Sequence, residues 1–219
     1  MGDLAFEEVI YKFAVWALPV LYAITLHEVA HGWMANKLGD STAKMLGRLS
    51  LNPLKHIDPI GTVLVPVMLL LINSPFLFGW AKPVPVNFRN LKNYRRDMVV
   101  VAAAGPLANL AMAVGWSLLL WLFYLIIPDA NVQRGLMQMS IAGILINLIL
   151  MVFNLLPIPP LDGGRVLSGL TPPRISQVLD RIEPYGMFII LGLLVLGVLP
   201  MILNPIVGSL FGLLTAWMS

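Results

Sequence analysis

The sequence predicts an all-α polytopic membrane protein, with about five to six transmembrane helices in a single domain covering residues 1–219. Hydrophobic residues make up 58% of the 219 residues and charged residues only 11%, and the mean hydropathy is +0.85. A soluble domain carries about 25% charged residues. The apolar runs are continuous instead of alternating every second residue, which favours helices over a barrel.

The first apolar stretch predicts a helix over residues 6–38 that ends at Gly39. This helix is longer than the about 20 residues that a bilayer core requires. The N-terminus carries Asp3, Glu7 and Glu8 in place of the basic region of a signal peptide. We therefore expect no cleavable leader.

The segment between the first helix and the next long apolar run is the hardest to interpret. Leu49 and Leu51 alternate with polar neighbours, which indicates a short strand. Residues 60–78 are apolar but contain prolines, which favours a re-entrant hairpin, whereas their length of about 19 residues favours a full span; we expect re-entry. Residues 80–87 contain two prolines and predict an extended edge strand.

Long apolar runs predict further helices over residues 98–127 and 135–156. The first contains the small residues of the segment 102–106, which allow close helix packing, and three prolines end the second. The last part, residues 176–219, holds two apolar segments that we expect to separate between residues 200 and 205.

The basic residues predict how the chain is oriented. Of the 14 Lys and Arg, twelve lie at residues 37–55, 82–96 and 165–181. The positive-inside rule places these regions on the cytoplasmic side of the cell membrane. Because the basic residues lie in loops between apolar segments, the net charge of +3 does not indicate a nucleic-acid partner.

A metal-binding motif, His-Glu-Val-Ala-His, occupies residues 27–31 of the first helix. In a helix His27 and His31 lie on one face, one turn apart, and can bind one zinc ion. Glu28 can then serve as general base toward a water activated by the ion. The alternative is a packed pair of histidines without metal. The chain has no cysteine, so every ligand must be His, carboxylate or amide.

A catalytic zinc site takes three protein ligands, so a third one is needed. Four side chains on the same side of the membrane are candidates: Asp162, Asp97, Asp58 and His56. Asp162 is the strongest of them, because it follows a helix end that three prolines interrupt. Its spacing is equally typical of an N-cap for a helix over residues 163–170.

These motifs resemble those of the site-2 proteases, a family of intramembrane zinc metalloproteases. Residues 27–32 match the first motif of that family, and residues 154–164 match the second, Asn-x-x-Pro followed by Leu-Asp-Gly. Residues 104–109 are similar to its Gly-Pro packing element. The resemblance covers a catalytic core of about residues 15–170, outside which residues 171–219 form a C-terminal helix pair.

The resemblance implies that Asp162 is the third zinc ligand. It also implies that Asn154 holds the substrate or the developing oxyanion, for which the alternative is a hydrogen bond between helices. The chain resembles the short bacterial and archaeal forms, without a peptide-binding PDZ domain or a nucleotide-binding domain.

The expected function is that of a zinc metalloendopeptidase that hydrolyses peptide bonds in or near transmembrane segments, as in regulated intramembrane proteolysis. Its active site faces the cytoplasmic side. The expected partners are transmembrane protein substrates and the lipid bilayer, with no nucleic acid, and the sequence leaves the oligomeric state open. The alternatives are a binding or scaffold protein of the same fold and a metal transporter.

Two further features have open roles. His56 can approach the metal or the substrate, or it is an ordinary loop residue. Residues 80–87 can capture substrate by backbone pairing, as peptide-binding sheet edges do, or they only connect two helices.

Overall fold

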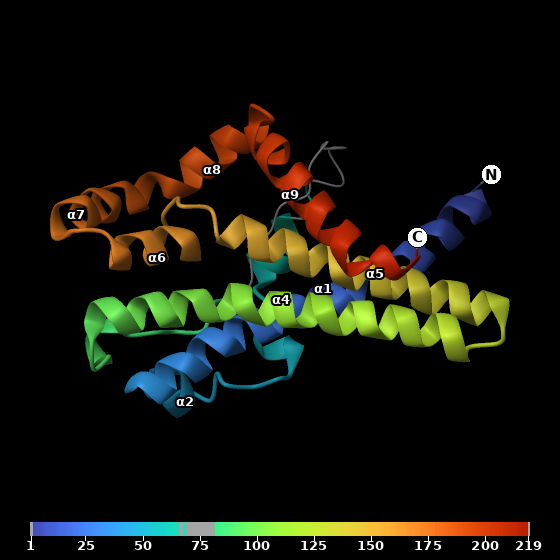
Figure 1. The fold of residues 1–219 in the computed structure, drawn as a ribbon, viewed down its shortest axis with the longest axis horizontal. Coiled ribbons are helices and arrows are strands. Elements are labelled where there is room, and N and C mark those ends of the chain that lie inside the picture. The colour runs from blue at the N-terminus through green and yellow to red at the C-terminus, as the bar shows by residue number, and fades with distance from the viewer. Residues whose placement is uncertain (1, 66–67, 69–81, 219) are drawn as a thin grey trace.

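The computed structural model of the protein describes residues 2–65, 68 and 82–218. Three long helices lie side by side in Figure 1: α1 (Gly2–Leu38), α4 (Tyr94–Ile126) and α5 (Ala130–Asn154). They confirm the predicted long helices, with ends that differ by a few residues. Each of the three packs against the other two.

The C-terminal part adds four helices, α6 (Asp162–Leu170), α7 (Pro173–Ile182), α8 (Gly186–Val195) and α9 (Val198–Leu214). The short elements are α2 (Thr42–Met45), η1 (Pro53–Lys55), η2 (Pro59–Leu64), η3 (Phe88–Asn90), η4 (Glu183–Tyr185) and η5 (Ala216–Met218). Within the described residues every regular element is a helix, which agrees with the predicted all-α class.

The two predicted strands are absent from this part of the chain. The segment with Leu49 and Leu51 runs without regular structure and pairs with no strand. Residues 82–87, the described part of the predicted edge strand, also form no ladder. Two of these residues are prolines, which have no N–H to donate to a ladder.

Among the residues that the structure describes, three helices are long and apolar enough to cross a membrane, over Ile10–Leu38, Tyr94–Ile126 and Ala130–Asn154. The C-terminal pair Pro173–Val195 and Val198–Leu214, bent by 79°, gives a fourth candidate if it is a single span. The predicted five to six spans are therefore not confirmed. The re-entrant hairpin expected at residues 60–78 lies largely outside the described residues.

The bend in the C-terminal pair lies at Gly197. We had expected it between the prolines at 200 and 205. Gly197 has φ +73°, a left-handed conformation that glycine adopts readily. Pro200 falls in the first turn of α9, where a backbone N–H has no partner within the helix. The prediction from the prolines was therefore wrong.

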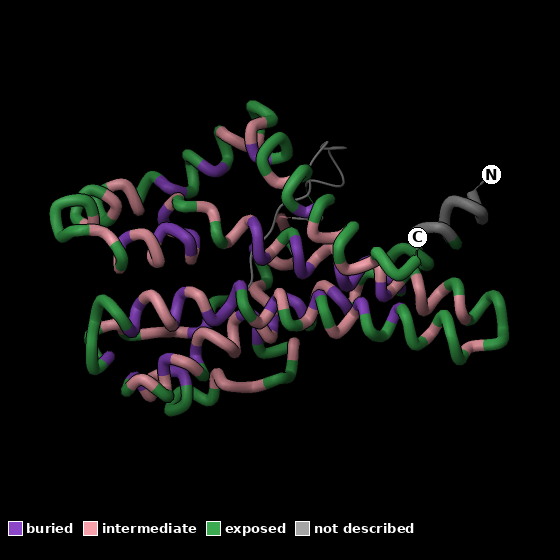
Figure 2. The backbone as a smooth tube through the Cα atoms, in the orientation of Figure 1, coloured by how far each residue is buried: buried purple, intermediate pink, exposed green. Residues whose placement is uncertain are grey.

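Buried residues concentrate where α1, α4 and α5 meet (Figure 2). The core between α4 and α5 includes Leu120, Ile144 and Leu148, none of which is exposed. Large apolar side chains such as Phe13 and Leu118 point outward, with exposures of 73% and 62%. An apolar outer surface around a helical core is typical of a protein surrounded by lipid.

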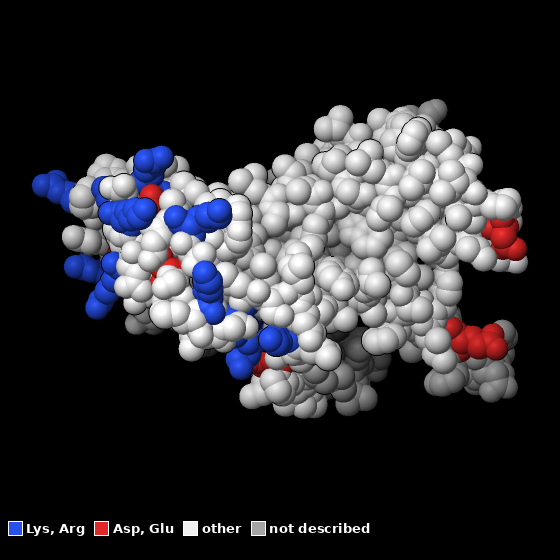
Figure 3. Space-filling view, turned by 90° about the horizontal axis from the view of Figure 1, so that it is seen from below, with Lys and Arg blue, Asp and Glu red and all other residues white. Residues whose placement is uncertain are grey.

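On the face that Figure 3 shows, the basic side chains gather at one end of the molecule. This is the end where α1 terminates, α4 begins and α6 and α7 lie (Figure 1). The three basic regions of the sequence thus lie at the same end of the fold, as the orientation argument requires.

Candidate metal centre

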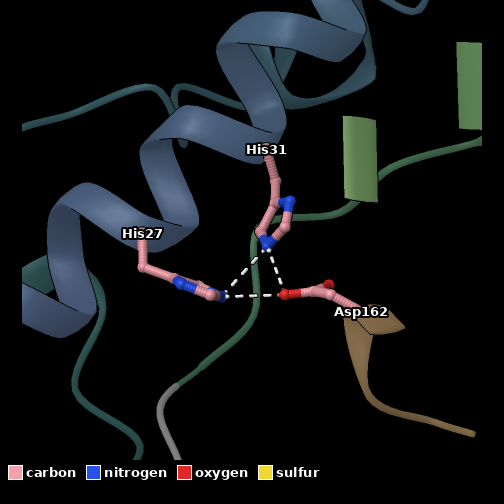
Figure 4. Close-up of side chains that lie close together, drawn as sticks. All are labelled: His27, His31 and Asp162. Carbon is pink, nitrogen blue, oxygen red and sulfur yellow. Dashed lines mark hydrogen bonds and ion pairs between the residues drawn. The ribbon is translucent and has the colours of Figure 1, made fainter. Parts of the chain in front are cut away.

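The side chains of His27, His31 and Asp162 converge on one point (Figure 4). The two Nε2 atoms lie 3.0 Å apart, and each lies 3.3 Å from Oδ2 of Asp162. The histidines extend from consecutive turns of α1, and Asp162 comes from the start of α6. The predicted i, i+4 geometry and the third group are therefore present together.

The first turn of α6 reaches α1 because glycines lie next to Asp162. A Cβ on Gly163 would collide with the backbone of Leu155 and Leu156, and one on Gly164 would lie 2.5 Å from the nitrogen of Pro159. Only glycine allows α6 to pack this closely on the chain that follows α5. Leu161 is the N-cap of α6, so Asp162 does not cap the helix, and its carboxylate faces the histidines.

The outer nitrogens of both imidazoles have hydrogen-bond partners. Nδ1 of His31 lies 2.8 Å from the main-chain oxygen of Val101, and Nδ1 of His27 lies 2.5 Å from Oδ1 of Asn109. A carbonyl oxygen only accepts, so each Nδ1 carries the proton. Each neutral imidazole then presents the lone pair of Nε2 to the shared point.

This donor set fits a zinc ion. Two Nε2 lone pairs and a carboxylate oxygen face one another, and the buried Oδ2 of Asp162 has no hydrogen-bond partner in the described part of the chain. Such a group of acceptors repels itself unless a cation lies between them. A tetrahedral zinc ion with ligands at about 2.0–2.1 Å has neighbouring ligands about 3.3 Å apart, close to the distances between these three atoms.

Glu28 lies beside the point where His27, His31 and Asp162 converge, which we call the metal point, but it is not one of the converging residues. Its Oε2 accepts a hydrogen bond of 2.7 Å from the backbone N–H of Val84. Both residues line a cavity of about 300 Å³ that also contains His27, Asp162 and Asn154. The motif of α1, Asp162 and the segment before α4 therefore meet around this cavity.

Asn154 lines this cavity at the end of α5. Its Nδ2 donates a hydrogen bond to the main-chain oxygen of Leu150, one turn earlier in the same helix, at 2.9 Å. The amide is thus anchored within its own helix beside the metal point. Its role toward a substrate stays a prediction.

The other three candidate ligands are engaged elsewhere. Oδ2 of Asp97 accepts from the N–H of Asn93 at the start of α4. Asp58 caps η2, since its Oδ1 accepts from the first backbone N–H groups of that turn. The buried His56 donates through Nε2 to the main-chain oxygen of Ser50 at 2.8 Å, and its Nδ1 has no hydrogen-bond partner among the described residues.

Sequence reasoning missed two contributors to the centre. Gly105 was expected to promote helix packing in general, but a Cβ there would collide with Nε2 of His31 and lie 2.7 Å from Cε1 of His27. Asn109 was noticed only as part of the Gly-Pro element. Both residues belong to the Gly-Pro element at residues 104–109, which was the one sign of their importance. Nothing in the sequence connected that element with the histidines.

Comparison with known proteins gives the family. A profile described as Peptidase family M50 matches residues 122–197, which include Asp162 and Asn154. A Bacillus subtilis protein named "Putative zinc metalloprotease YwhC" is 43% identical over 180 residues, covering 81% of this chain and 78% of the relative. The chain belongs to peptidase family M50.

Further relatives match parts of the chain. A Mycolicibacterium smegmatis protein named "Putative zinc metalloprotease Rip2" is 31% identical over 80% of this chain and 64% of its own length. A Methanocaldococcus jannaschii protein named "Putative zinc metalloprotease MJ0611" is 43% identical over 68 residues, covering 31% of this chain and 32% of the relative. No solved structure matches. These names specify zinc, which agrees with the two imidazoles and the carboxylate of the M50 centre.

Proposed function

We propose that the protein is an intramembrane zinc metalloendopeptidase that hydrolyses peptide bonds in or near transmembrane segments of membrane proteins, as in regulated intramembrane proteolysis. The observation that carries the proposal is the convergence of Asp162 on His27 and His31, which lie beside Glu28 on a helix of membrane-spanning length. Ionisable groups at such a position are costly to keep in a membrane and therefore indicate a functional site.

Each polar residue of the cavity then has a distinct role. His27, His31 and Asp162 hold the ion. When bound, zinc supplies Lewis acidity, which polarises a carbonyl and makes a water more acidic. Glu28 accepts the proton of the attacking water and returns it to the nitrogen of the leaving amine. Asn154, at the C-terminal end of α5, donates a hydrogen bond to the substrate or the oxyanion.

The substrate must expose its backbone before it is cut. A transmembrane helix keeps its carbonyl groups in its own hydrogen bonds, so part of it has to unwind near the ion. Residues 82–87 have no regular structure, and Pro83, Val84 and Val86 line the cavity. Backbone pairing with this segment would offset part of the unwinding cost.

The proposed orientation places the centre toward the cytoplasmic side of the cell membrane. The basic regions at the end of α1, the start of α4 and around α6 support it, because short basic loops stay in the cytoplasm. His27 and His31 lie in the last third of α1, nearer this end than the other.

The test is cleavage of a membrane-spanning peptide by the detergent-purified protein, with and without a zinc chelator. We expect chelator-sensitive cleavage that is lost in Glu28→Gln while that variant still binds zinc. His27→Ala serves as the matched variant that loses both. Cleavage that persists in Glu28→Gln contradicts the assignment of the base, and zinc uptake by proteoliposomes without cleavage contradicts the protease.

A further inference from the structure

A buried row of hydrogen bonds connects the zinc ligand His27 with the far side of the helix bundle. Nδ1 of His27 is paired with Oδ1 of Asn109 on α4, and Nδ2 of Asn109 donates to Oδ1 of Asn147 on α5 at 2.9 Å. Both asparagines are completely buried. Two amides without exposure, lying end to end between three helices, are expensive unless every group is paired.

The far end of the row determines the orientation of Asn147. Its Nδ2 donates to the main-chain oxygen of Gly143 at 2.8 Å. Because a backbone carbonyl can only accept, the amide nitrogen of Asn147 must point there. The other end of the same amide, Oδ1, is then directed at Asn109.

Asn109 is oriented by two acceptors at once. Its Nδ2 has two hydrogens, one directed to Oδ1 of Asn147 and the other to the main-chain oxygen of Ala23 at 3.2 Å. A flipped amide would place its oxygen against two acceptors. The oxygen of Asn109 therefore faces His27 and can only accept from it.

The orientation of Asn109 determines which nitrogen of His27 faces the metal point with a lone pair. With an obligate acceptor at Nδ1, His27 carries its proton there and keeps the lone pair of Nε2 for the ion. His31 obtains the same tautomer from the main-chain oxygen of Val101. A substitution of Val101 leaves that oxygen in place, so the tautomer of His27 is the one that side-chain changes can disturb.

We propose that Asn109 and Asn147 are positioning residues for the zinc centre, acting in series: Asn147 orients Asn109, and Asn109 fixes the tautomer and the ring of His27. The proposal extends the metal centre and does not depend on proteolysis. Its readout is zinc affinity, so a failure to cleave peptides would contradict the proposed function and leave this inference standing.

The experiment measures the zinc Kd of the full-length protein in detergent by chelator competition, for Asn109→Leu, Asn147→Leu and the double variant. Partners of metal ligands typically contribute about 10- to 100-fold in metal affinity. We expect a Kd increase of about this size for Asn109→Leu and a smaller one for Asn147→Leu, since Ala23 still orients Asn109. Because the residues act in series, the double variant should match Asn109→Leu.

Ser140→Ala is the matched control. Ser140 is also completely buried in α5, but its hydroxyl donates to Leu136 of the same helix and has no connection with His27. Its zinc Kd should equal that of the wild type. The visible spectrum of the Co²⁺-loaded protein should change in the asparagine variants and stay constant in this control.

Additive effects of the two asparagine changes on Kd would overturn the series arrangement. A zinc Kd for Asn109→Leu within twofold of the wild type would overturn the proposal altogether. If Asn109→Leu does not fold, the test is the comparison of the zinc Kd of Asn147→Leu with that of Ser140→Ala. Equal Kd values for these two variants would overturn the role of the amides.

Discussion

The carboxylate of Glu28 accepts a hydrogen bond of 2.7 Å from the main-chain N–H of Val84. Val84 stands between Pro83 and Pro85, neither of which has an N–H. Within this triplet Val84 is thus the single possible donor, and it is directed at the proposed base. Arg48 also holds this segment, since its guanidinium donates to the main-chain oxygens of Lys82 and Pro83.

Replacing Val84 with proline should slow cleavage without releasing zinc. The change removes the N–H that fixes Oε2 of Glu28, and a hydrogen bond to a charged group contributes about 1.5–3 kcal/mol. We expect kcat to fall by about 10- to 100-fold. Val84→Ala keeps the N–H, so a similar loss of kcat in both variants would show that the side chain matters and the hydrogen bond does not.

Gly105→Ala should abolish zinc binding. The added Cβ collides with Nε2 of His31, the atom that faces the ion. Gly115→Ala is the matched control, because Gly115 lies in the same helix and a Cβ there has no neighbour within 4 Å. Zinc content after purification measures both. A Gly105→Ala protein with stoichiometric zinc would contradict the close approach of α4 to the histidines.

Removal of zinc should lower the thermal stability, and only when Asp162 is present. An ion that binds the folded state alone stabilises it by about 2.7 kcal/mol when free zinc is about 100 times Kd. We expect a chelator to lower the Tm of the wild type and to leave Asp162→Ala unchanged. Asp129→Ala, which removes the N-cap of α5 far from the centre, should start from a lower Tm and still respond to the chelator.

Asp40→Asn should destabilise the protein at neutral pH by about 2 kcal/mol. Burial alone would raise the pKa of Asp40, but hydrogen bonds from Thr42, Asn90 and the N–H of Asn87 outweigh it and lower that pKa. A carboxyl with a lowered folded-state pKa contributes stability above its unfolded value, near 3.8, and loses it as the pH falls further.

The check is thermal unfolding of the wild type and Asp40→Asn between about pH 3 and 7. The Tm difference should be constant near neutrality and shrink below about pH 4. A difference that is independent of pH would mean that the charge of Asp40 contributes nothing.

The histidine pair could be predicted from the sequence because its geometry is local. Spacing alone places His27 and His31 on one face of a helix. Asp162 lies more than a hundred residues away, and spacing left it tied with an N-cap until the family motif favoured the ligand. The position of Leu161 as the N-cap of α6 now removes that alternative.

The rest of the site could not be predicted, because its contacts join distant segments. Val84 and Asn109 reach Glu28 and His27 only after three helices have packed, and no local pattern encodes that packing. The edge strand failed for a related reason: the N–H of Val84 is bound to a carboxylate instead of a neighbouring strand. The predicted break between the C-terminal helices was wrong because Pro200 and Pro205 fit within α9, whereas Gly197 forms the turn before it.

The proton arrangement of the histidines determines the electrical balance of the centre. With Nδ1–H donating to Asn109 and Val101 and Nε2 bound to the ion, both imidazoles would be neutral. The carboxylates of Asp162 and Glu28 bring one negative charge each, and a divalent ion cancels both. In the proposed function the zinc-loaded centre would thus be electroneutral, and α1 would hold it below the membrane surface without the cost of an uncompensated charge in a low-dielectric medium.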